Sequence, residues 1–125
     1  MKEIEIGEYV RTKNGIIGRS KEVSSVGCWI ENDFRISKRD IIKHSKQLID
    51  LIEAGDIVNK ELVIDIINAT NDKEEIVGRK LITQYRLAQF TGLDIKYYIY
   101  SSDIKTILTK EQYIANCYKV GGEDE

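Results

Sequence analysis

The sequence predicts a protein of the α+β class that is mainly β and contains two small β modules related by internal duplication. Residues 7–18 have an altered counterpart in residues 55–64, and the close of the first copy, 40–46, is echoed by 103–110. The openings lie 48 positions apart and the closings 63, so the second copy carries about 15 extra residues. Short β-branched runs bounded by Gly and Asn favour strands in both copies.

The first copy opens with a hairpin pattern. Apolar and polar residues alternate as far as Tyr9 and Val10. Asn14-Gly15 follows, a pair suited to the two positive-φ positions of a type I′ turn. Gly18 then indicates a bulge or a close backbone approach. This pattern resembles the first strands of an SH3-like barrel of the kind seen in KOW and Tudor modules, and a generic β-hairpin is the alternative.

Turn and helix signals set the first boundaries. The first β module covers residues 1–45, which hold enough strand signals for five short strands. A connecting helix covers residues 46–54, because Leu48, Leu51 and Ile52 are spaced to share one helix face. We therefore expect two SH3-like modules joined by a short helix.

The second β module covers residues 55–120 and contains the extra residues. Its run 62–67 is so apolar that we expect it to be buried on both sides. The insertion spans 71–92, where Asp72 and Glu75 form a start like a capping box. A helix is the first interpretation of this insertion, and a β-hairpin rich in Ile, Val and Thr is the alternative.

The last part of the chain has two clear patterns. Residues 95–100 predict a strand from their aromatic and β-branched content. Thr109 and Gln112 form a capping box that predicts a helix over 110–116. The side chains that we expect to face inward are Tyr113, Ile114 and Cys117. Residues 121–125 form an acidic tail that we expect to be disordered.

Composition argues against several classes of partner. The chain has 19 basic and 21 acidic residues and a net charge of −2. Proteins that bind duplex DNA usually carry a basic excess, because their affinity comes from neutralising phosphates, so we expect no nucleic-acid partner. No apolar run approaches the ~18 residues of a membrane span, and the first residues lack a signal-peptide pattern. We therefore expect a cytoplasmic protein without a membrane partner.

The reactive residues predict neither a metal site nor catalysis. Cys28 and Cys117 lie 89 positions apart, and His44 cannot join them at any usual ligand spacing, so we expect buried, reduced thiols. His44 has Asp40 and Ser45 nearby but no fixed catalytic partner. We expect a non-enzymatic protein with no catalytic residues, no metal and no cofactor.

Basic and aromatic residues mix in and around the insertion. Guanidinium and ammonium groups bind phosphate, and flat rings stack on nucleobases, so the mixture predicts a site for a small nucleotide-derived ligand. On a helix, Arg79 and Arg86 would share one face, with Lys80 beside them. The same pattern is also typical of a solvated face. The predicted ligand-binding residues are Arg79, Lys80, Tyr85, Arg86, Phe90 and Tyr98.

The first module offers a second predicted surface. Trp29 and Phe34 flank Arg35, where an SH3-like barrel would place an aromatic cage, although a single Trp is also typical of a core. The first hairpin adds a modest basic edge that consists of Arg11, Lys13, Arg19 and Lys21. Trp29 and Arg35 are therefore candidates for contact with a host protein.

The framework resembles a set of small proteins carried by clostridial phages and prophages. The resemblance rests on residues 8–18, 43–46, 48–56 and 104–113, roughly half of the chain. One group, the first-described Thoeris anti-defence proteins, is similar in size and source. Its members sequester a cyclic ADP-ribose-type immune signal between the subunits of an oligomer. The resemblance therefore implies a homo-oligomer that acts in a bacterial host cell.

These observations together predict a non-enzymatic counter-defence protein that sequesters a nucleotide-derived immune signal, such as a cyclic ADP-ribose isomer. One alternative is a protein that inhibits a host complex, for example a CRISPR effector or a polymerase. Another is a KOW-like module that binds RNA or DNA.

Overall fold

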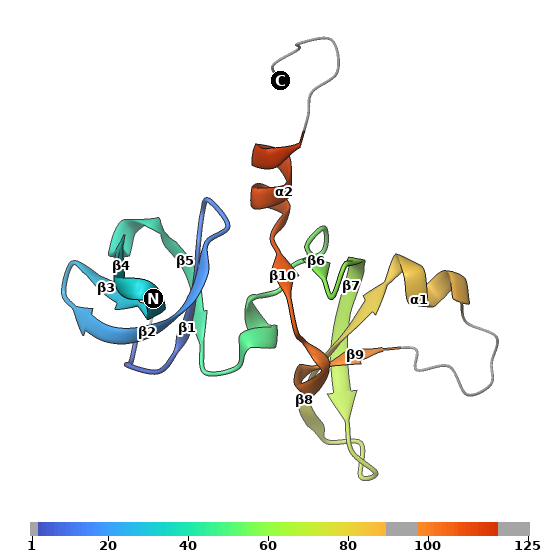
Figure 1. The fold of residues 1–125 in the computed structure, drawn as a ribbon. Coiled ribbons are helices and arrows are strands. Elements are labelled where there is room, and N and C mark those ends of the chain that lie inside the picture. Colours follow the sequence, from blue (N-terminus) through green and yellow to red (C-terminus); the bar gives the residue numbers. More distant parts are fainter. Residues whose placement is uncertain (1–2, 90–97, 118–125) are drawn as a thin grey trace.

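The described chain is built mainly from β-strands. The computed structural model describes residues 3–89 and 98–117, with only the backbone at Asn32 and at residues 87–89. Two five-stranded antiparallel sheets form most of this part of the chain, accompanied by two short α-helices and several 3-10 helices (Figure 1). The prediction of a mainly β chain of the α+β class is therefore confirmed.

The first sheet has one apolar face. It contains β1 (Tyr9–Thr12), β2 (Ile17–Ser24), β3 (Gly27–Ile30), β4 (Phe34–Ser37) and β5 (Ile41–Ser45). Cys28 and Ile30 are two positions apart on β3 and are both buried, whereas Trp29 between them is exposed, as the alternation of a strand requires. The core residues are Ile4, Val10, Cys28, Ile30, Ile36 and Ile41.

The second sheet has a separate core. It contains β6 (Ile57–Val58), β7 (Glu61–Thr70), β8 (Ile76–Thr83), β9 (Ile99–Tyr100) and β10 (Ile107–Leu108). The core residues are Ile49, Ile52, Val58, Val63, Leu81 and Ile99. Ile49 and Ile52 come from the segment between the sheets, so this segment packs with the second sheet.

Both sheets follow the same strand order. Each is a meander of four strands whose fifth strand returns to pair with the first, giving β4-β3-β2-β1-β5 and β10-β6-β7-β8-β9. A 3-10 helix lies between the fourth and fifth strands in each case, namely η2 (Lys38–Asp40) and η4 (Ser101–Asp103). Among the described strands, no pairing joins the two outer strands of either sheet, so neither sheet closes into a barrel.

The type I′ turn predicted at Asn14-Gly15 is wrong. Thr12 N–H donates to the carbonyl of Ile16, which leaves a three-residue loop in which only Gly15 has a positive φ, +85°. The turn at Asn59 and Lys60 between β6 and β7 has both residues at positive φ, 53° and 67°, as a type I′ turn requires. The loop length therefore decided the turn type.

The helix predicted over 46–54 is also wrong, because only η3 (Leu48–Leu51), a 3-10 helix, forms there. Ile49, Leu51 and Ile52 are all buried. In an α-helix, Ile49 and Leu51 would point to nearly opposite sides, whereas the 3-10 turn followed by extended backbone at Ile52 buries all three residues. Burial of this segment against the sheets thus overrides its helical spacing.

The helix predicted over 71–92 is replaced largely by a strand. The turn and second strand of the β7–β8 hairpin fall in this range, and among its described residues, 71–89, only α1 (Gln84–Gln89) is helical. The Asn71 side chain accepts hydrogen bonds from the N–H groups of Lys73 and Glu75, at 2.9 and 3.0 Å. This local turn competes with a helix start, and the β-branched residues that follow favour a strand. The β-hairpin alternative therefore holds in part: β8 is a hairpin strand within the insertion, but its partner β7 lies before it.

The run 62–67 is not buried on both sides. Leu62 is 40% exposed and Ile64 39% exposed. The pairing register between β7 and β8 shifts between Val63 and Asp65, so Ile64 occupies a bulge outside the regular ladder. The second sheet therefore exposes apolar side chains.

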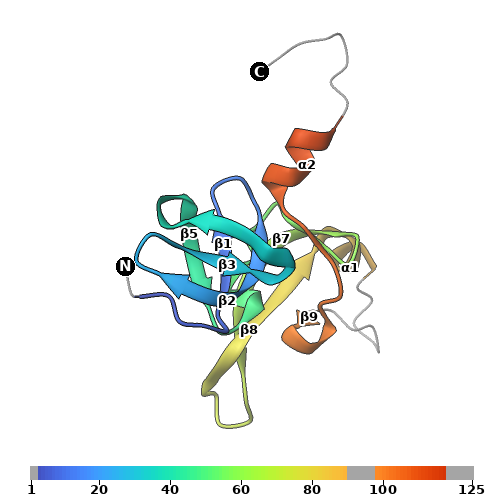
Figure 2. The same ribbon diagram turned by 60° about the vertical axis from the view of Figure 1, so that its left-hand side comes forward.

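The C-terminal helix has the predicted bounds but not the predicted contacts. α2 (Lys110–Asn116) begins with a capping box, in which Gln112 N–H donates to Thr109 Oγ1 at 3.3 Å and Thr109 N–H to Gln112 Oε1 at 3.0 Å. The three residues expected to face inward, Tyr113, Ile114 and Cys117, are exposed. The helix extends away from both sheets and is attached at its first turn (Figure 2).

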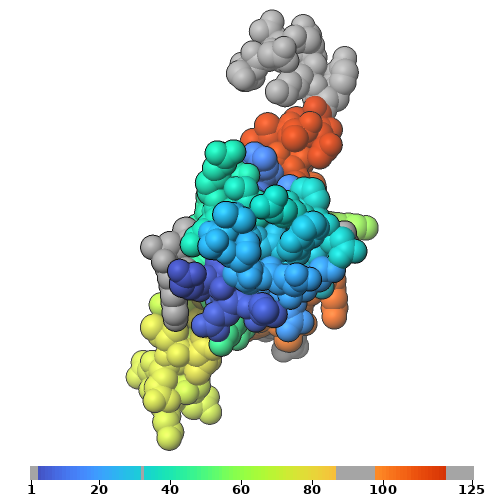
Figure 3. All heavy atoms as spheres, turned by 90° about the vertical axis from the view of Figure 1, so that its left-hand side faces the viewer, coloured from blue at the N-terminus to red at the C-terminus, as the bar shows by residue number. Residues whose placement is uncertain are grey.

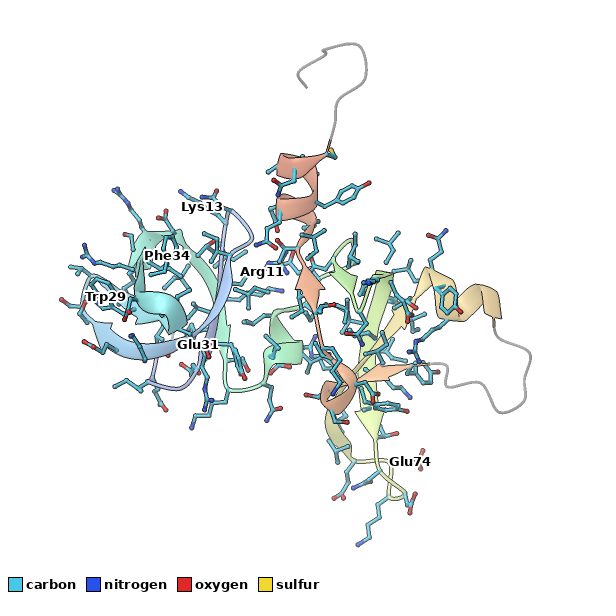
Figure 4. All side chains as sticks on the ribbon, in the orientation of Figure 1. Arg11, Lys13, Trp29, Glu31, Phe34 and Glu74 are labelled. Carbon is cyan, nitrogen blue, oxygen red and sulfur yellow. The ribbon has the colours of Figure 1, made fainter. Side chains whose placement is uncertain are left out.

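A fully buried arginine joins the two sheets. Arg11 leaves β1 and reaches Asp56, just before β6, and Glu111 in α2. Figure 4 shows it pointing from the first sheet toward the second. Arg11 therefore does not belong to an exposed basic edge, contrary to the expectation from the sequence.

Candidate ligand-binding groove

The candidate cations on β8 face different surfaces. Arg79 and Lys80 are neighbours on this strand, so their side chains point to opposite faces of the sheet. Lys80 Nζ lies 3.9 Å from the centroid of the Tyr98 ring and 6.0 Å from that of Tyr100. Lys80 and Tyr98 thus form a cation–π pair on the face away from Arg79.

Arg86 makes contacts within the second sheet. Its Nε donates to Glu61 Oε1 at 3.0 Å, and the same oxygen accepts from Thr83 Oγ1 at 2.6 Å. Another guanidinium nitrogen donates to the carbonyl of Tyr98 at 3.4 Å. Arg86 therefore connects α1 to β7 and to the residue before β9. Because Arg79 lies on a strand, the two arginines do not share a helical face.

The remaining two candidates are Tyr85 and Phe90. Tyr85 is on α1 and is 60% exposed. Phe90 lies outside the described residues. Of the six candidates, the structure brings together Lys80 and Tyr98 as neighbouring side chains and leaves Arg79 on another surface.

A groove of about 470 Å³ opens beside Arg79. One wall is the β7–β8 hairpin, which projects from the body of the molecule on the side opposite α2 (Figure 3). The other wall is formed by residues of η3 and η4 and their neighbours. We call it the hairpin groove. Its polar side chains include those of Gln47, Asp50, Arg79, Ser101 and Ser102, and its apolar ones those of Ile49, Ala69 and Val77.

The only cationic side chain that lines this groove, within the described ranges 3–89 and 98–117, is loosely paired. Arg79 Nε lies 3.7 Å from Asp50 Oδ1, and both side chains are partly exposed. This distance is too long for a hydrogen bond. The other Asp50 oxygen accepts a hydrogen bond from Ser45 Oγ at 2.7 Å. Asp50 is therefore held by Ser45, while the Arg79 guanidinium keeps its donors for another acceptor.

The hairpin wall has open space beside Gly78. Gly78 has a φ of +152°, and a Cβ added there would meet no atom within 4 Å. Ser101 and Ser102 are exposed on the opposite wall. A ligand could therefore contact hydroxyl groups on one side and a guanidinium on the other.

A smaller cavity of about 270 Å³ lies between the two sheets. Its apolar lining includes Ile17, Leu48 and Ile107, and Glu31 and Lys105 supply charges of opposite sign. The described part of this lining has no arginine, so it is a poorer site than the hairpin groove for a doubly charged phosphate.

The predicted second surface lies on the outside of the first sheet. Trp29 and Arg35 are directly opposite each other on β3 and β4, and both are exposed. Figure 4 shows Trp29 and Phe34 on the side of the first sheet away from the junction. This surface is thus separate from the hairpin groove.

His44 on β5 is engaged by the carboxylate of Glu8, the residue directly before β1. Its Nδ1 lies 3.0 Å from Glu8 Oε1. Burial raises the pKa of Glu8, but the N–H of Glu5 and the His44 ring outweigh this and lower it below its ordinary value. The described residues contain no group of three or more His, Cys, Asp or Glu side chains that could hold a metal ion.

Several groove residues were not predicted from the sequence. Gln47, Asp50, Ser101 and Ser102 come from two 3-10 regions that are far apart in sequence. Each is a common surface residue type, and no local pattern distinguishes it from a loop residue. Only Arg79 carried a recognisable signal, because a cation in an aromatic-rich segment suggests an anion site.

No family model, curated protein or solved structure matches this chain. Within the described segments, none of the helices has the length and apolar character needed to cross a membrane.

Proposed function

We propose that the protein is a non-enzymatic binding protein that holds a nucleotide-derived anion in the hairpin groove. The observation that carries this proposal is the loosely paired Arg79 guanidinium on the wall of a groove with an apolar lining and two serines opposite. The groove volume, about 470 Å³, falls in the range of roughly 300–1,000 Å³ that is typical of small-molecule sites.

The groove chemistry supports a phosphate-bearing ligand. The Arg79 guanidinium can donate two parallel hydrogen bonds to one phosphate group, which an ammonium cannot do. Asp50 is its present neighbour at 3.7 Å, and a phosphate would compete with that carboxylate. Ser101 and Ser102 would donate from the other wall, while Ile49 and Val77 would cover the less polar part of the ligand.

Sequestration is the role that we propose for this binding. The protein would retain a cyclic ADP-ribose isomer or a related immune signal intact in a bacterial host cell, as the resemblance to phage anti-defence proteins implies. The proposed mechanism requires neither a base nor a metal, because the ligand is only bound. Lys80 and Tyr98, on the opposite face, would then contribute to a different contact.

We also propose that the protein acts as a homo-oligomer. Leu62, Ile64, Tyr113 and Ile114 are apolar or aromatic and exposed, which supports contacts between copies of the chain. Light scattering after size-exclusion chromatography tests this point. A monomer at all accessible concentrations would contradict it.

We further propose that the two sheets are SH3-like modules that arose by internal duplication. The identical strand order and the 3-10 helix between the fourth and fifth strands of each sheet support this relationship. The groove then lies on the copy that carries the longer hairpin. In this account, duplication supplied the framework and the longer hairpin supplied the binding site.

Thermal unfolding with a panel of ligands tests the proposed function. The panel contains cyclic ADP-ribose isomers, ADP-ribose, cyclic dinucleotides and an unphosphorylated nucleoside. A ligand present at 100 times its Kd should stabilise the protein by about 2.7 kcal/mol. Mass spectrometry of the released ligand should recover it unchanged. The absence of any stabilisation, or recovery of a hydrolysed product, would contradict the proposal.

A further inference from the structure

The outer edge of β4 has unused backbone hydrogen-bonding groups. β4 is an edge strand of the first sheet and pairs only with β3 among the described strands. Lys38 N–H donates to the carbonyl of Val26 at 2.8 Å, which fixes the alternation of backbone groups along β4. The backbone groups of Phe34 and Ile36 therefore face β3, and those of Arg35 and the N–H of Ser37 point outward, whereas the Ser37 carbonyl begins the 3-10 helix η2.

A small cavity lies beside this edge. Its volume is about 120 Å³, and all four residues of β4 line it. Its other side is formed by Thr12 at the end of β1, by Asn14 and Ile16 of the β1–β2 loop, and by Asp40. The cavity is large enough for one short side chain of a segment that runs along β4.

The same edge carries a local positive charge. Arg35, Lys38 and Arg39 are exposed, and none of them forms an ion pair with another residue in the described part of the chain. The two nearby acids are already engaged, since Asp40 pairs with Lys13 and Asp33 with Lys21. Three cations therefore remain available at this edge of a nearly neutral protein.

Two exposed aromatic side chains border these cations. Trp29 is 41% exposed and Phe34 49% exposed. Trp29 lies directly across from Arg35, and Phe34 starts β4. The edge therefore offers backbone donors and acceptors, positive charge and apolar contact area in one place.

We propose that the β4 edge binds an extended acidic peptide segment of a partner protein, which adds to the sheet as an antiparallel or parallel strand. Strand addition uses the outward backbone groups of Arg35 and the N–H of Ser37, and the side chains of the segment alternate between the cavity and solvent. Carboxylates of the segment pair with Arg35, Lys38 and Arg39. This site is separate from the hairpin groove and does not depend on its function.

Charge and backbone geometry favour an acidic peptide at the β4 edge over a second copy of the chain and over an RNA strand. If two β4 edges from separate copies paired with each other, their cations would face one another, so a second copy is a poor occupant. An RNA strand would satisfy the cations but cannot complete the alternating backbone hydrogen bonds of a sheet edge. An acidic peptide satisfies both the cations and the backbone hydrogen-bonding groups of the edge.

Fluorescence anisotropy with a labelled eight-residue peptide of alternating Glu and Val tests this proposal. The wild-type protein should bind it, and the double variant Arg35→Glu/Lys38→Glu should bind it about tenfold or more weakly. Lys73→Glu, an exposed charge reversal in the distant hairpin turn, and Arg79→Ala in the groove should leave the affinity unchanged.

Two further probes, a methylated peptide and a uridine octamer, are tested on the wild-type protein. A peptide methylated on alternate backbone nitrogens should lose binding, because methylation removes the donors that a strand needs. The proposal is overturned if the methylated peptide binds as well as its parent, if a uridine octamer binds more tightly than the peptide, or if the Glu/Val peptide does not bind.

Discussion

Arg11 and Asp56 form a two-armed ion pair in which both side chains are fully buried. The nitrogen to oxygen distances are 2.5 and 3.0 Å; Arg11 lies on β1 of the first sheet, and Asp56 directly precedes β6 of the second. Arg11 also donates to the carbonyl of Leu51 at 2.9 Å and to Glu111 Oε1 at 2.7 Å. Burial would lower the pKa of Arg11, but Asp56 raises it above its ordinary value.

Removal of Asp56 should destabilise the whole molecule. Asp56→Ala would leave a buried guanidinium without its main partner, and it would also remove the acceptor for the N–H groups of Glu53 and Lys110. The expected loss is about 3–5 kcal/mol of unfolding free energy in urea titrations. The double variant Arg11→Met/Asp56→Leu should lose less unfolding free energy than Arg11→Met and Asp56→Leu lose together. If the two single losses add up to that of the double variant, the pair does not join the sheets.

Gly15→Ala should displace the start of α2. A Cβ at this position would overlap Thr109 Oγ1 and lie 2.9 Å from the Cβ of Glu111, and φ is +85°. Thr109 Oγ1 now donates to the Gly15 carbonyl at 2.8 Å, so the substitution disturbs that contact as well. We expect a loss of at least about 2 kcal/mol in thermal or urea unfolding.

Gly7→Ala is the matched control for this variant. Gly7 also has a positive φ, +96°, but a Cβ there would meet no atom within 4 Å. Gly7→Ala should lower the free energy of unfolding only by the backbone strain, about 1 kcal/mol. Equal losses in the two variants would mean that the contact between the first hairpin and α2 contributes little.

Glu53 should make stability sensitive to acid. Burial raises the pKa of its carboxyl, but hydrogen bonds from Lys110 and Lys43 and the charge of Arg11 outweigh this and lower the pKa to about 2. Because the folded pKa is below the ordinary value of 4.5, the stabilising contribution is complete above that value and is lost as pH falls toward 2. The stability difference between wild type and Glu53→Gln should shrink across this window. A constant difference from pH 7 to pH 2 would contradict this assignment.

Asn59 should anchor the segment between β9 and β10. Its amide donates to the carbonyl of Asp103 at 2.7 Å, and its Oδ1 accepts from the N–H groups of Lys105 and Thr106 at 2.7 and 3.1 Å. Asn59→Ala should cost about 2–4 kcal/mol, because it removes these bonds and strains a residue at positive φ. Asn59→Asp keeps the acceptor oxygen and should lose less unfolding free energy than Asn59→Ala. Hydrogen exchange at Lys105 and Thr106 reports the effect directly.

Local patterns predicted the elements that depend on local contacts. The capping box of Thr109 and Gln112 specifies the start of α2, since both partners lie within one helical turn. The turn at Asn59 and Lys60 is local in the same way, because its conformation depends on a two-residue loop. The direction in which α2 points depends on distant contacts and was predicted wrongly.

The buried junction and the groove could not be predicted from local patterns. Arg11 finds Asp56 and Glu111 at separations of 45 and 100 residues, and a cation on a hairpin is ordinarily exposed. Arg79 was selected for its chemistry, but its groove partners Asp50 and Ser101 are brought near by packing of the 3-10 regions against the β7–β8 hairpin. The choice of helix over hairpin for the insertion also placed Arg79 and Arg86 together incorrectly.

Isothermal titration calorimetry with cyclic ADP-ribose isomers and ADP-ribose tests the binding proposal most directly. The wild-type protein should bind at least one of them, Arg79→Ala should bind it about 10- to 100-fold more weakly, and Asp50→Asn should bind it more tightly because the competing carboxylate is removed. Arg35→Ala, which lies outside the groove, should bind as the wild type does. No binding of any of these ligands, or equal affinities for Arg79→Ala and Arg35→Ala, would contradict the account.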